Sequence, residues 1–141
     1  NLFPQGISNV KLVAPGILAI SCTAFETYNK AIIEMEDWAN YLRDYLSEEV
    51  KSLPLILICD DADFVSETYN NFLWTTFTRA NPSHDIYGID SFTQHKHWGC
   101  KGSLIIDIRI KPHHAPQLVL DDEVEKRVDS IFQNHSELSK L

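Results

Sequence analysis

The chain lacks the features that mark several classes of protein. Basic residues are scarce, because 12 Lys and Arg face 20 Asp and Glu, for a formal net charge of −8. This balance argues against unassisted binding to a nucleic-acid backbone or an anionic membrane surface, since both require clustered Lys and Arg. No apolar run is long enough to span a bilayer, and the first residues do not resemble a signal peptide. We therefore expect a cytoplasmic protein that has no membrane span and binds no nucleic acid.

Cysteine is also scarce. The three cysteines, Cys22, Cys59 and Cys100, are an odd number and lie far apart. Two of them fall inside predicted strands. This usage indicates reduced core cysteines and not a disulfide framework.

The common catalytic and nucleotide-binding fingerprints are missing. No Gly-x-Ser-x-Gly elbow is present, and no P-loop or Gly-x-Gly-x-x-Gly follows a strand. The acidic turn Asp60–Asp63 has two interpretations: carboxylates for a divalent cation, or caps for the following helix. It lacks the glycine and the closing glutamate of a calcium loop. We assign no metal ligand and no catalytic residue.

The stretch Leu55–Cys59 organises the fold that we predict. This short apolar run follows Pro54 and ends at the acidic turn, which is typical of a strand buried on both faces. A helix is predicted over Ser66–Arg79, with Ser66 as its N-cap and Tyr69, Phe72, Leu73 and Phe77 as its apolar face. Ligands of open α/β sheets bind outside the carboxyl ends of the strands, where the acidic turn lies.

The remaining pattern favours one α/β domain with flanking helices. Residues 10–13 and 17–22 form either two strands or one interrupted edge strand, and 86–89 and 104–108 are further strands. A long amphipathic helix separates 17–22 from 55–59, so these two strands are expected to pair in parallel. Residues 90–102 have the composition of a polar loop. The helix stripe consists of Ile32, Met35, Trp38, Ala39, Leu42, Tyr45, Leu46 and Val50. We predict a central, mostly parallel or mixed sheet and a C-terminal helix.

The C-terminal region divides the chain into residues 1–120, the α/β part, and residues 121–141, a terminal helix and tail. Residues 111–116 form a proline-punctuated linker, and Asp121–Glu123 opens the helix. Its stripe of Val124, Val128, Ile131 and Phe132 either contacts another subunit or covers the chain's own sheet.

The segment between residues 95 and 102 offers two binding hypotheses. His95, His97 and Cys100, with the later His113 and His114, are candidate zinc ligands by residue type, and His97 and Cys100 have ligand-like spacing. Lys101 lies among glycines that let the backbone approach an anion. The alternatives are a solvated loop and a surface lysine.

Trp74–Asp85 reads Trp-Thr-Thr-Phe-Thr-Arg-Ala-Asn-Pro-Ser-His-Asp, and Gly99-Cys100-Lys101 precedes the predicted strand that contains Leu104–Asp107. Together these segments resemble the C-terminal domain of the UbiD-type decarboxylases, the prenylated-flavin-dependent enzymes related to 3-polyprenyl-4-hydroxybenzoate decarboxylase. Trp74–Asp85 is similar to the family's Trp-Ala-x-x-Thr-Arg-x-Asp-Pro-x-x-Asp, with Asn81 where Asp is usual. Gly99-Cys100-Lys101 followed by Leu104–Asp107 resembles the family's Gly-Ser-Lys before a hydrophobic-Asp strand end. Ile106–Pro112 resembles the menaquinone-pathway branch.

The resemblance implies non-oxidative decarboxylation of a small aromatic or α,β-unsaturated acid, as in quinone biosynthesis, by a homo-oligomer. The cofactor would be prenylated FMN, with potassium and a divalent metal. The family's catalytic residues and metal ligands belong to a preceding domain, and the chain opens at Asn1, so we expect a domain of a longer protein. The resemblance carries one residue over: Lys101, onto the lysine that contacts the cofactor phosphate. Aligned on Asp107, Ser103 takes that place. The alternative function is a structural oligomerisation domain with no ligand contact.

Overall fold

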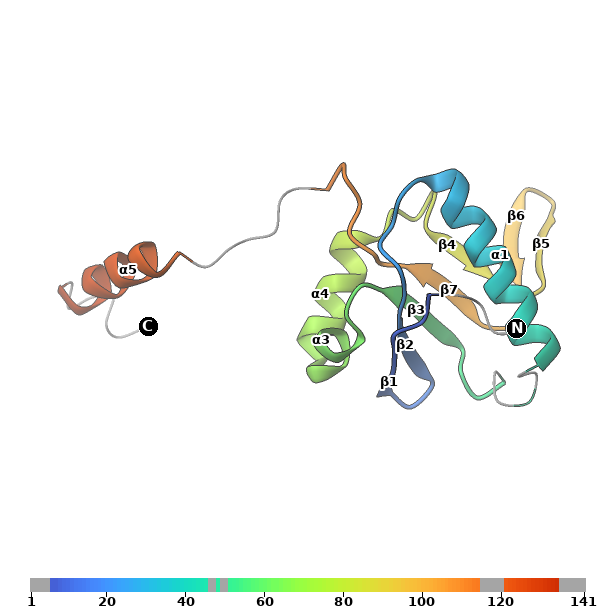
Figure 1. The fold of residues 1–141 in the computed structure, drawn as a ribbon, viewed down its shortest axis with the longest axis horizontal. Helices are drawn as coiled ribbons and strands as arrows, with labels where there is room; N and C mark the ends of the chain where they lie inside the picture. The colour runs from blue at the N-terminus through green and yellow to red at the C-terminus, as the bar shows by residue number, and fades with distance from the viewer. Residues whose placement is uncertain (1–5, 46–47, 49–50, 115–120, 135–141) are drawn as a thin grey trace.

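The fold is built on a five-stranded mixed sheet (Figure 1). The computed structural model describes residues 6–45, 48, 51–114 and 121–134. In spatial order the strands are β1 (Asn9–Ala14), β2 (Ile17–Ser21), β3 (Leu55–Cys59), β7 (Leu104–Asp107) and β4 (Ile86–Gly88). Strands β2, β3 and β7 are parallel, and β1 and β4 are antiparallel to their neighbours. This confirms the mixed α/β sheet with β3 in its middle and the parallel pairing of β2 with β3.

Helices cover both faces of the sheet. Helix α1 (Tyr28–Tyr45) packs on one face, and α3 (Ala62–Glu67) and α4 (Tyr69–Arg79) pack on the other (Figure 1). Successive residues of β3 alternate between the two cores: Ile56 and Ile58 contact the α1 side, and Leu57 and Cys59 contact the α3–α4 side. All four are fully buried. A strand buried on both faces explains the unbroken apolar run.

The predicted helix over Ser66–Arg79 is two helices. Asp61 is the N-cap of α3, and its side chain accepts a hydrogen bond from the Phe64 N–H at 3.0 Å. Thr68 is extended, ends α3 and caps α4 by accepting from the Asn71 N–H at 3.0 Å. The prediction of Ser66 as an N-cap is wrong, because the acidic turn supplies the first cap two residues after β3.

The helix faces were predicted in part. Met35, Trp38 and Leu42 are buried as expected, but Ile32 is 43% exposed, and Leu46 and Val50 lie outside the described residues. In α4, Phe72 is buried, whereas Tyr69 and Phe77 are 63% and 79% exposed, so their assignment to the apolar face is wrong. The buried face of α4 consists of Phe72, Thr75 and Thr76. The prediction missed this face because it counted only apolar residues, and two of the three buried residues are threonines.

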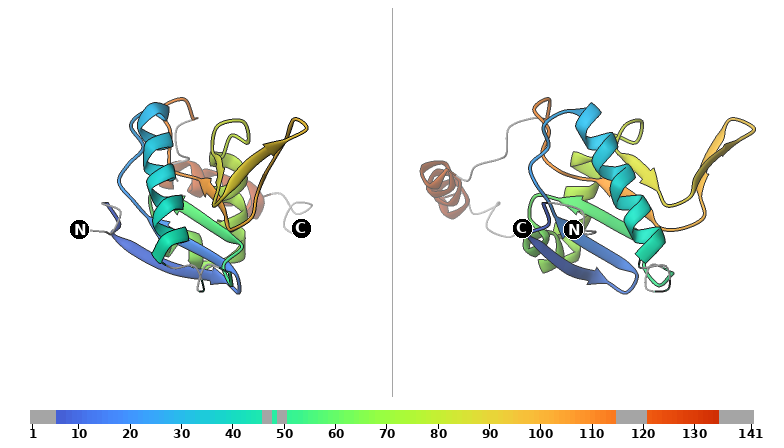
Figure 2. Two further views of the ribbon diagram at one scale, coloured as in Figure 1. Left: turned by 90° about the vertical axis from the view of Figure 1, so that its right-hand side faces the viewer. Right: turned by 45° about the vertical axis from the view of Figure 1, so that its right-hand side comes forward.

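Residues 90–102, predicted as a polar loop, form a β-hairpin. Strands β5 (Ser91–Gln94) and β6 (His97–Cys100) pair with each other and form a separate sheet. The hairpin extends away from the body of the domain (Figure 2). The turn residues His95 and Lys96 have φ values of 50° and 66°. Such left-handed two-residue turns match the twist of paired strands. The prediction failed because the exposed strands carry no apolar alternation.

Helix α5 (Asp122–Asn134) follows residues 115–120. Every described side chain from Asp121 to Phe132 is exposed, including the apolar stripe of Val124, Val128, Ile131 and Phe132. The stripe therefore does not cover the sheet of its own chain. Among the described residues, no helix has the length and apolarity needed to cross a membrane.

Candidate functional site

Lys101 lies in a pocket at the amino ends of the parallel strands. We call this the amino-edge pocket. It has a volume of about 410 Å³, and it is lined by Arg43, Lys51, Pro54, Ile89, Asp90, Lys101, Gly102 and Ser103. Pro54 directly precedes β3, and Ser103 directly precedes β7. The pocket is therefore at the end of the sheet opposite to the acidic turn that follows β3.

The charges of the amino-edge pocket favour an anion. Three cationic side chains face one carboxylate there. Arg43 pairs with Asp44 at 2.8 Å and lies 3.8 Å from Asp90, and Lys51 pairs with Glu48 at 2.8 Å. For Lys101, no carboxylate within the described ranges lies in ion-pair distance of the ammonium. Lys101 is exposed and can pair with a phosphate as a mobile point charge.

Ser103, the alternative to Lys101, has a structural contact. Its side chain is buried, and its hydroxyl donates a hydrogen bond to the Leu53 carbonyl at 2.5 Å. The contact joins the segments that enter β7 and β3. Of the two residues, Lys101 has the exposed donor group.

The zinc hypothesis finds no matching geometry in the hairpin. His97 and Cys100 are three residues apart in β6, so their side chains project from opposite faces of the two-stranded ribbon. In the part of the chain that the structure describes, no three His, Cys, Asp or Glu side chains gather as metal ligands would. His113 and His114 contact each other, with ring centroids 4.8 Å apart.

The acidic turn has structural contacts at each of its aspartates. Asp60 accepts from the Ile110 N–H at 2.7 Å and lies 3.7 Å from the Arg79 guanidinium. Asp61 caps α3. Asp63 pairs with Lys11 at 2.7 Å. The interpretation as a capping turn is confirmed.

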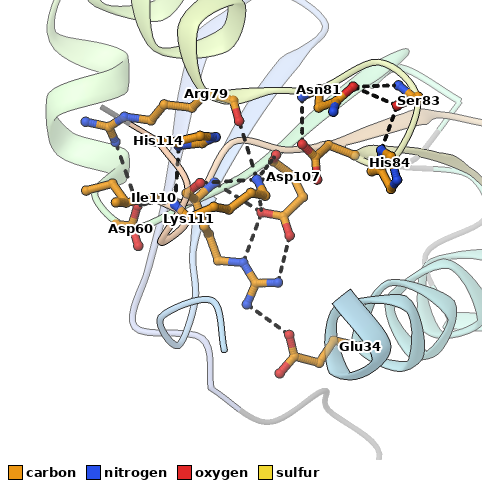
Figure 3. Close-up of polar contacts among 12 residues, drawn as sticks. Glu34, Asp60, Arg79, Asn81, Ser83, His84, Asp107, Ile110, Lys111 and His114 are labelled. Atoms are coloured by element: carbon orange, nitrogen blue, oxygen red, sulfur yellow. Dashed lines mark hydrogen bonds and ion pairs between the residues drawn. The ribbon is translucent and has the colours of Figure 1, made fainter. Parts of the chain in front are cut away.

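A buried ionic cluster follows β7 at the carboxyl end of the sheet (Figure 3). We call it the carboxyl-edge network, and its members are Glu34, Asp85, Asp107, Arg109 and Lys111. All except Glu34 are at most 1% exposed. A buried charge without a partner costs several kcal/mol, and these side chains are placed so that each one faces an opposite charge.

Arg109 is held by a fork-like contact with Asp107. Its Nε and Nη2 atoms donate to the two Asp107 carboxylate oxygens at 3.0 and 2.8 Å, and Nη1 donates to Glu34 at 2.9 Å and to the Thr23 carbonyl at 3.0 Å. Burial lowers the pKa of Arg109, but the hydrogen bonds and charges of Asp107 and Glu34 outweigh burial and raise it. Arg109 therefore ties β7 to α1 and to the loop before α1.

Lys111 joins the end of α4 to the end of β7. Its ammonium donates to the carbonyl of Arg79, the last residue of α4, and to those of Asp107 and Arg109, and it lies 3.4 Å from the Asp85 carboxylate. Asp85 also accepts from the Asn81 N–H at 2.6 Å, and its carbonyl accepts from the Asp107 N–H at 2.9 Å. Two of the segments that resemble the UbiD family, residues 74–85 and 106–112, therefore meet in this network.

Arg109 and Lys111 were not predicted as members of a site. Lys111 falls in the predicted linker, although it is fully buried. A signal was present, because Asp107, Arg109 and Lys111 alternate with Ile106, Ile108 and Ile110 at the period of an extended chain.

The structure also explains why Asn81 can stand where the UbiD motif usually has Asp. Its side-chain carbonyl oxygen accepts hydrogen bonds from the Ser83 N–H and hydroxyl, as an aspartate would.

The cysteines are not activated as nucleophiles. All three are free. Burial raises the pKa of Cys22 and of Cys59 to about 12, which keeps both as thiols at neutral pH. Cys59 is buried in the core as predicted, whereas Cys22 and Cys100 are half-buried.

The chain is similar in sequence to parts of known proteins and similar in fold to part of a solved structure. No family model matches the chain. It is 30% identical over 81 residues, 57% of its length, to a 4-hydroxybenzoate decarboxylase subunit of Chlamydia pneumoniae. It is 25% identical over 131 residues to an uncharacterized protein of Chlamydia muridarum. The matches cover 14% and 20% of these relatives, so the chain corresponds to a small part of each.

Among solved structures, the chain is similar to an evolved dimeric form of the UbiD-class enzyme HmfF from Pelotomaculum thermopropionicum in complex with prFMN. The TM-score is 0.50 at 13% identity, over 87% of this chain and 25% of that one. The chain thus shares its fold with part of a UbiD-class enzyme, and it is similar in sequence to part of a decarboxylase.

Proposed function

We propose that this chain is the C-terminal domain of a UbiD-like carboxy-lyase that decarboxylates an aromatic or α,β-unsaturated acid without oxidation. The observation that carries the proposal is the 30% identity over 81 residues to part of a 4-hydroxybenzoate decarboxylase. The shared fold supports it. The name of that relative favours an aromatic acid as substrate. Quinone biosynthesis, the menaquinone branch and a cytoplasmic location are further parts of the proposal, and they rest on the sequence resemblance.

The amino-edge pocket fits the phosphate end of prenylated FMN, the cofactor that the proposal requires. Its donors are three cationic side chains, and Lys101 and Gly102 lie in the loop before β7. When bound, the flavin supplies the electron-accepting chemistry of decarboxylation. Lys101 would bind the phosphate directly, and Arg43 and Lys51 would add positive charge beside it. Within the described residues, no cluster of His, Cys, Asp or Glu is placed to hold the divalent metal, and we assign that metal and the potassium that accompanies the flavin to the remainder of the longer protein.

The test of the phosphate contact uses the longer polypeptide that carries this domain. Lys101→Ala should reduce its flavin content, because a charge-assisted contact is worth about 1.5–3 kcal/mol, or roughly 10- to 100-fold in affinity. Lys96→Ala, in the hairpin turn outside the pocket, is the matched control. Flavin content is read from absorbance after gel filtration. An unchanged flavin content in Lys101→Ala removes the assignment.

The carboxy-lyase proposal has a separate test. The longer polypeptide, reconstituted with prenylated FMN, should release CO₂ from members of a panel of aromatic and α,β-unsaturated acids. The isolated 141-residue chain should release none, because the proposal places the catalytic residues outside it. Turnover by the isolated chain would contradict the placement of the catalytic residues outside it.

The second candidate function is a structural oligomerisation domain with no ligand contact. The specific observation is the apolar stripe of α5, with side chains 43–53% exposed. The occupant that we assign to it is a second copy of this chain. The similar HmfF structure is that of a dimeric form, which supports association between like subunits. The two candidate functions differ in whether the domain contacts the flavin phosphate, which the flavin content of Lys101→Ala tests, whereas association through α5 is expected under either of them.

A further inference from the structure

The ammonium of Lys111 is surrounded by more oxygen atoms than it has protons to donate. Its nitrogen lies 2.8 Å from the Asp107 carbonyl, 3.2 Å from that of Arg109 and 3.4 Å from that of Arg79. Carboxylate oxygens of Asp85 and Asp107 lie at 3.4 and 3.8 Å. An ammonium carries three N–H donors. The three carbonyls can accept all three protons, so the two carboxylate oxygens face the ammonium through charge alone, as oxygens do around an ion.

One of these oxygens shows that the lysine does not satisfy all of them. Oδ1 of Asp85 is buried and accepts no hydrogen bond from any described residue, although the Lys111 nitrogen is 3.4 Å away. Its attraction to Lys111 is therefore one of charge and not of a directed N–H. Buried polar atoms without a donor are rare in proteins. A spherical cation, which attracts oxygens from every direction, would satisfy this atom.

An aromatic ring completes the surroundings. The Lys111 nitrogen is 5.4 Å from the centroid of the Phe25 ring, within the range of a cation–π contact. The side chain of Lys111 is fully buried. Carbonyl oxygens that replace a hydration shell are typical of sites for potassium, whereas zinc prefers nitrogen and sulfur ligands and magnesium requires a tight octahedron.

We propose that these five oxygens and the Phe25 ring form a binding site for a monovalent cation of the size of ammonium or potassium. The chain fills this site with its own lysine. The charge balance supports the proposal. The carboxylates of Glu34, Asp85 and Asp107 are opposed by Arg109 and Lys111, so removing the ammonium leaves a further uncompensated negative charge that a free cation would neutralise.

The test replaces Lys111 by Met in the 141-residue chain. The Met side chain ends one atom before the lysine nitrogen, so the place of the ion becomes vacant. Thermal unfolding is measured in the chlorides of ammonium, potassium, sodium and tetramethylammonium at equal ionic strength. At ten times the dissociation constant, ammonium or potassium should raise the midpoint of Lys111→Met by about 5 °C over tetramethylammonium. The unsubstituted chain should show no such difference.

Two further variants make the result specific. Lys30→Met removes an ammonium that also faces two carboxylates, those of Glu26 and Glu34, but at an exposed position, and it should gain no cation selectivity. Lys111→Met combined with Asp85→Asn removes the buried charge and should lose the selectivity.

Three results would overturn the proposal. The first is equal midpoints for Lys111→Met in all four salts. The second is a Lys111→Met chain that fails to fold in every salt, because a vacant cation site must be restored by at least one of them. The third is selectivity that persists in the double variant, because the cation would then bind elsewhere.

Discussion

The carboxylate of Asp85 and the ammonium of Lys111 lie 3.4 Å apart, and neither side chain is more than 1% exposed. Asp85 directly precedes β4, and Lys111 follows β7, so this contact holds together the segment that enters the sheet and the segment that leaves it at the carboxyl ends of the parallel strands. Breaking one partner of a buried pair leaves the other charge without compensation. We therefore expect the largest effects of substitution on stability at this end of the molecule.

Asp85→Asn should destabilise the fold by about 3 kcal/mol, because Lys111 keeps only the more distant Asp107 carboxylate. Urea denaturation measures the loss as a lower midpoint with an unchanged slope. Asp44→Asn is the matched control, since Asp44 pairs with Arg43 at the surface, and it should change stability little. Equal stability of the two variants would contradict a stabilising role for the Asp85–Lys111 contact.

Arg109→Lys should cost about 2 kcal/mol despite the retained charge. Lysine lacks the planar fork that engages both oxygens of Asp107, and it cannot reach Glu34 at the same time. Denaturation by urea again gives the free energy of unfolding. The exposed Arg43→Lys serves as the comparison and should have little effect. If Arg109→Lys is as stable as the parent chain, the positive charge alone, and not the fork-like contact, accounts for the contribution of residue 109 to stability.

Stability should fall as the pH decreases below about 6.5, in part because of His114. Burial first, and then the charge of Lys111, lower the pKa of His114 from its ordinary value of 6.5 in the folded state. Nδ1 of the neutral ring accepts a hydrogen bond from the backbone N–H of Lys111 at 3.3 Å. Its surroundings also include His113, Asp85 and Arg79.

The sign follows from linkage. The unfolded chain binds the proton at a higher pH than the folded chain does, so the stability present above pH 6.5 is lost as the pH falls toward the folded pKa. His114→Gln should flatten this part of the profile of unfolding free energy against pH. A profile with the same slope in both proteins would show that His114 does not contribute.

Helix α5 should control the mass of the particle in solution. Val128→Glu with Ile131→Glu places two charges on the apolar stripe, where the side chains are 43% and 49% exposed. Light scattering should show a smaller mass than for the parent chain, because charges at an apolar contact are costly to bury. Lys126→Glu with Ser130→Glu alters the polar face and should leave the mass unchanged. An unchanged mass in the first variant removes the second copy as the occupant.

Local signals predicted most of the sheet and much of the first helix. Leu55–Cys59 was recognisable because a strand buried on both faces must be apolar throughout. Ser66 and the α4 face failed for a physical reason: Asp61 and Thr68 cap more effectively at positions set by the tertiary fold, and threonine can be buried when its hydroxyl bonds to its own helix. Thr75 does so by donating to the Asn71 carbonyl at 2.7 Å.

The two sites differ in how far the sequence could predict them. Lys101 was recognisable from its flanking residues, but Arg43 and Lys51 reach its pocket only because α1 ends beside the start of β3. The carboxyl-edge network was missed because Lys111 stands next to Pro112, and a lysine beside a proline usually indicates a solvent-exposed linker. Its burial depends on Asp85, which is distant in sequence.

The outer strand β1 has a consequence for how copies of the domain can meet. Its pairing with β2 shifts register between Leu12 and Ala14, and Lys11 lies on the same strand. An irregular, charged border strand is a poor template for adding a strand from another molecule. The addition of a strand from a neighbouring copy is thus disfavoured at the β1 edge of the sheet.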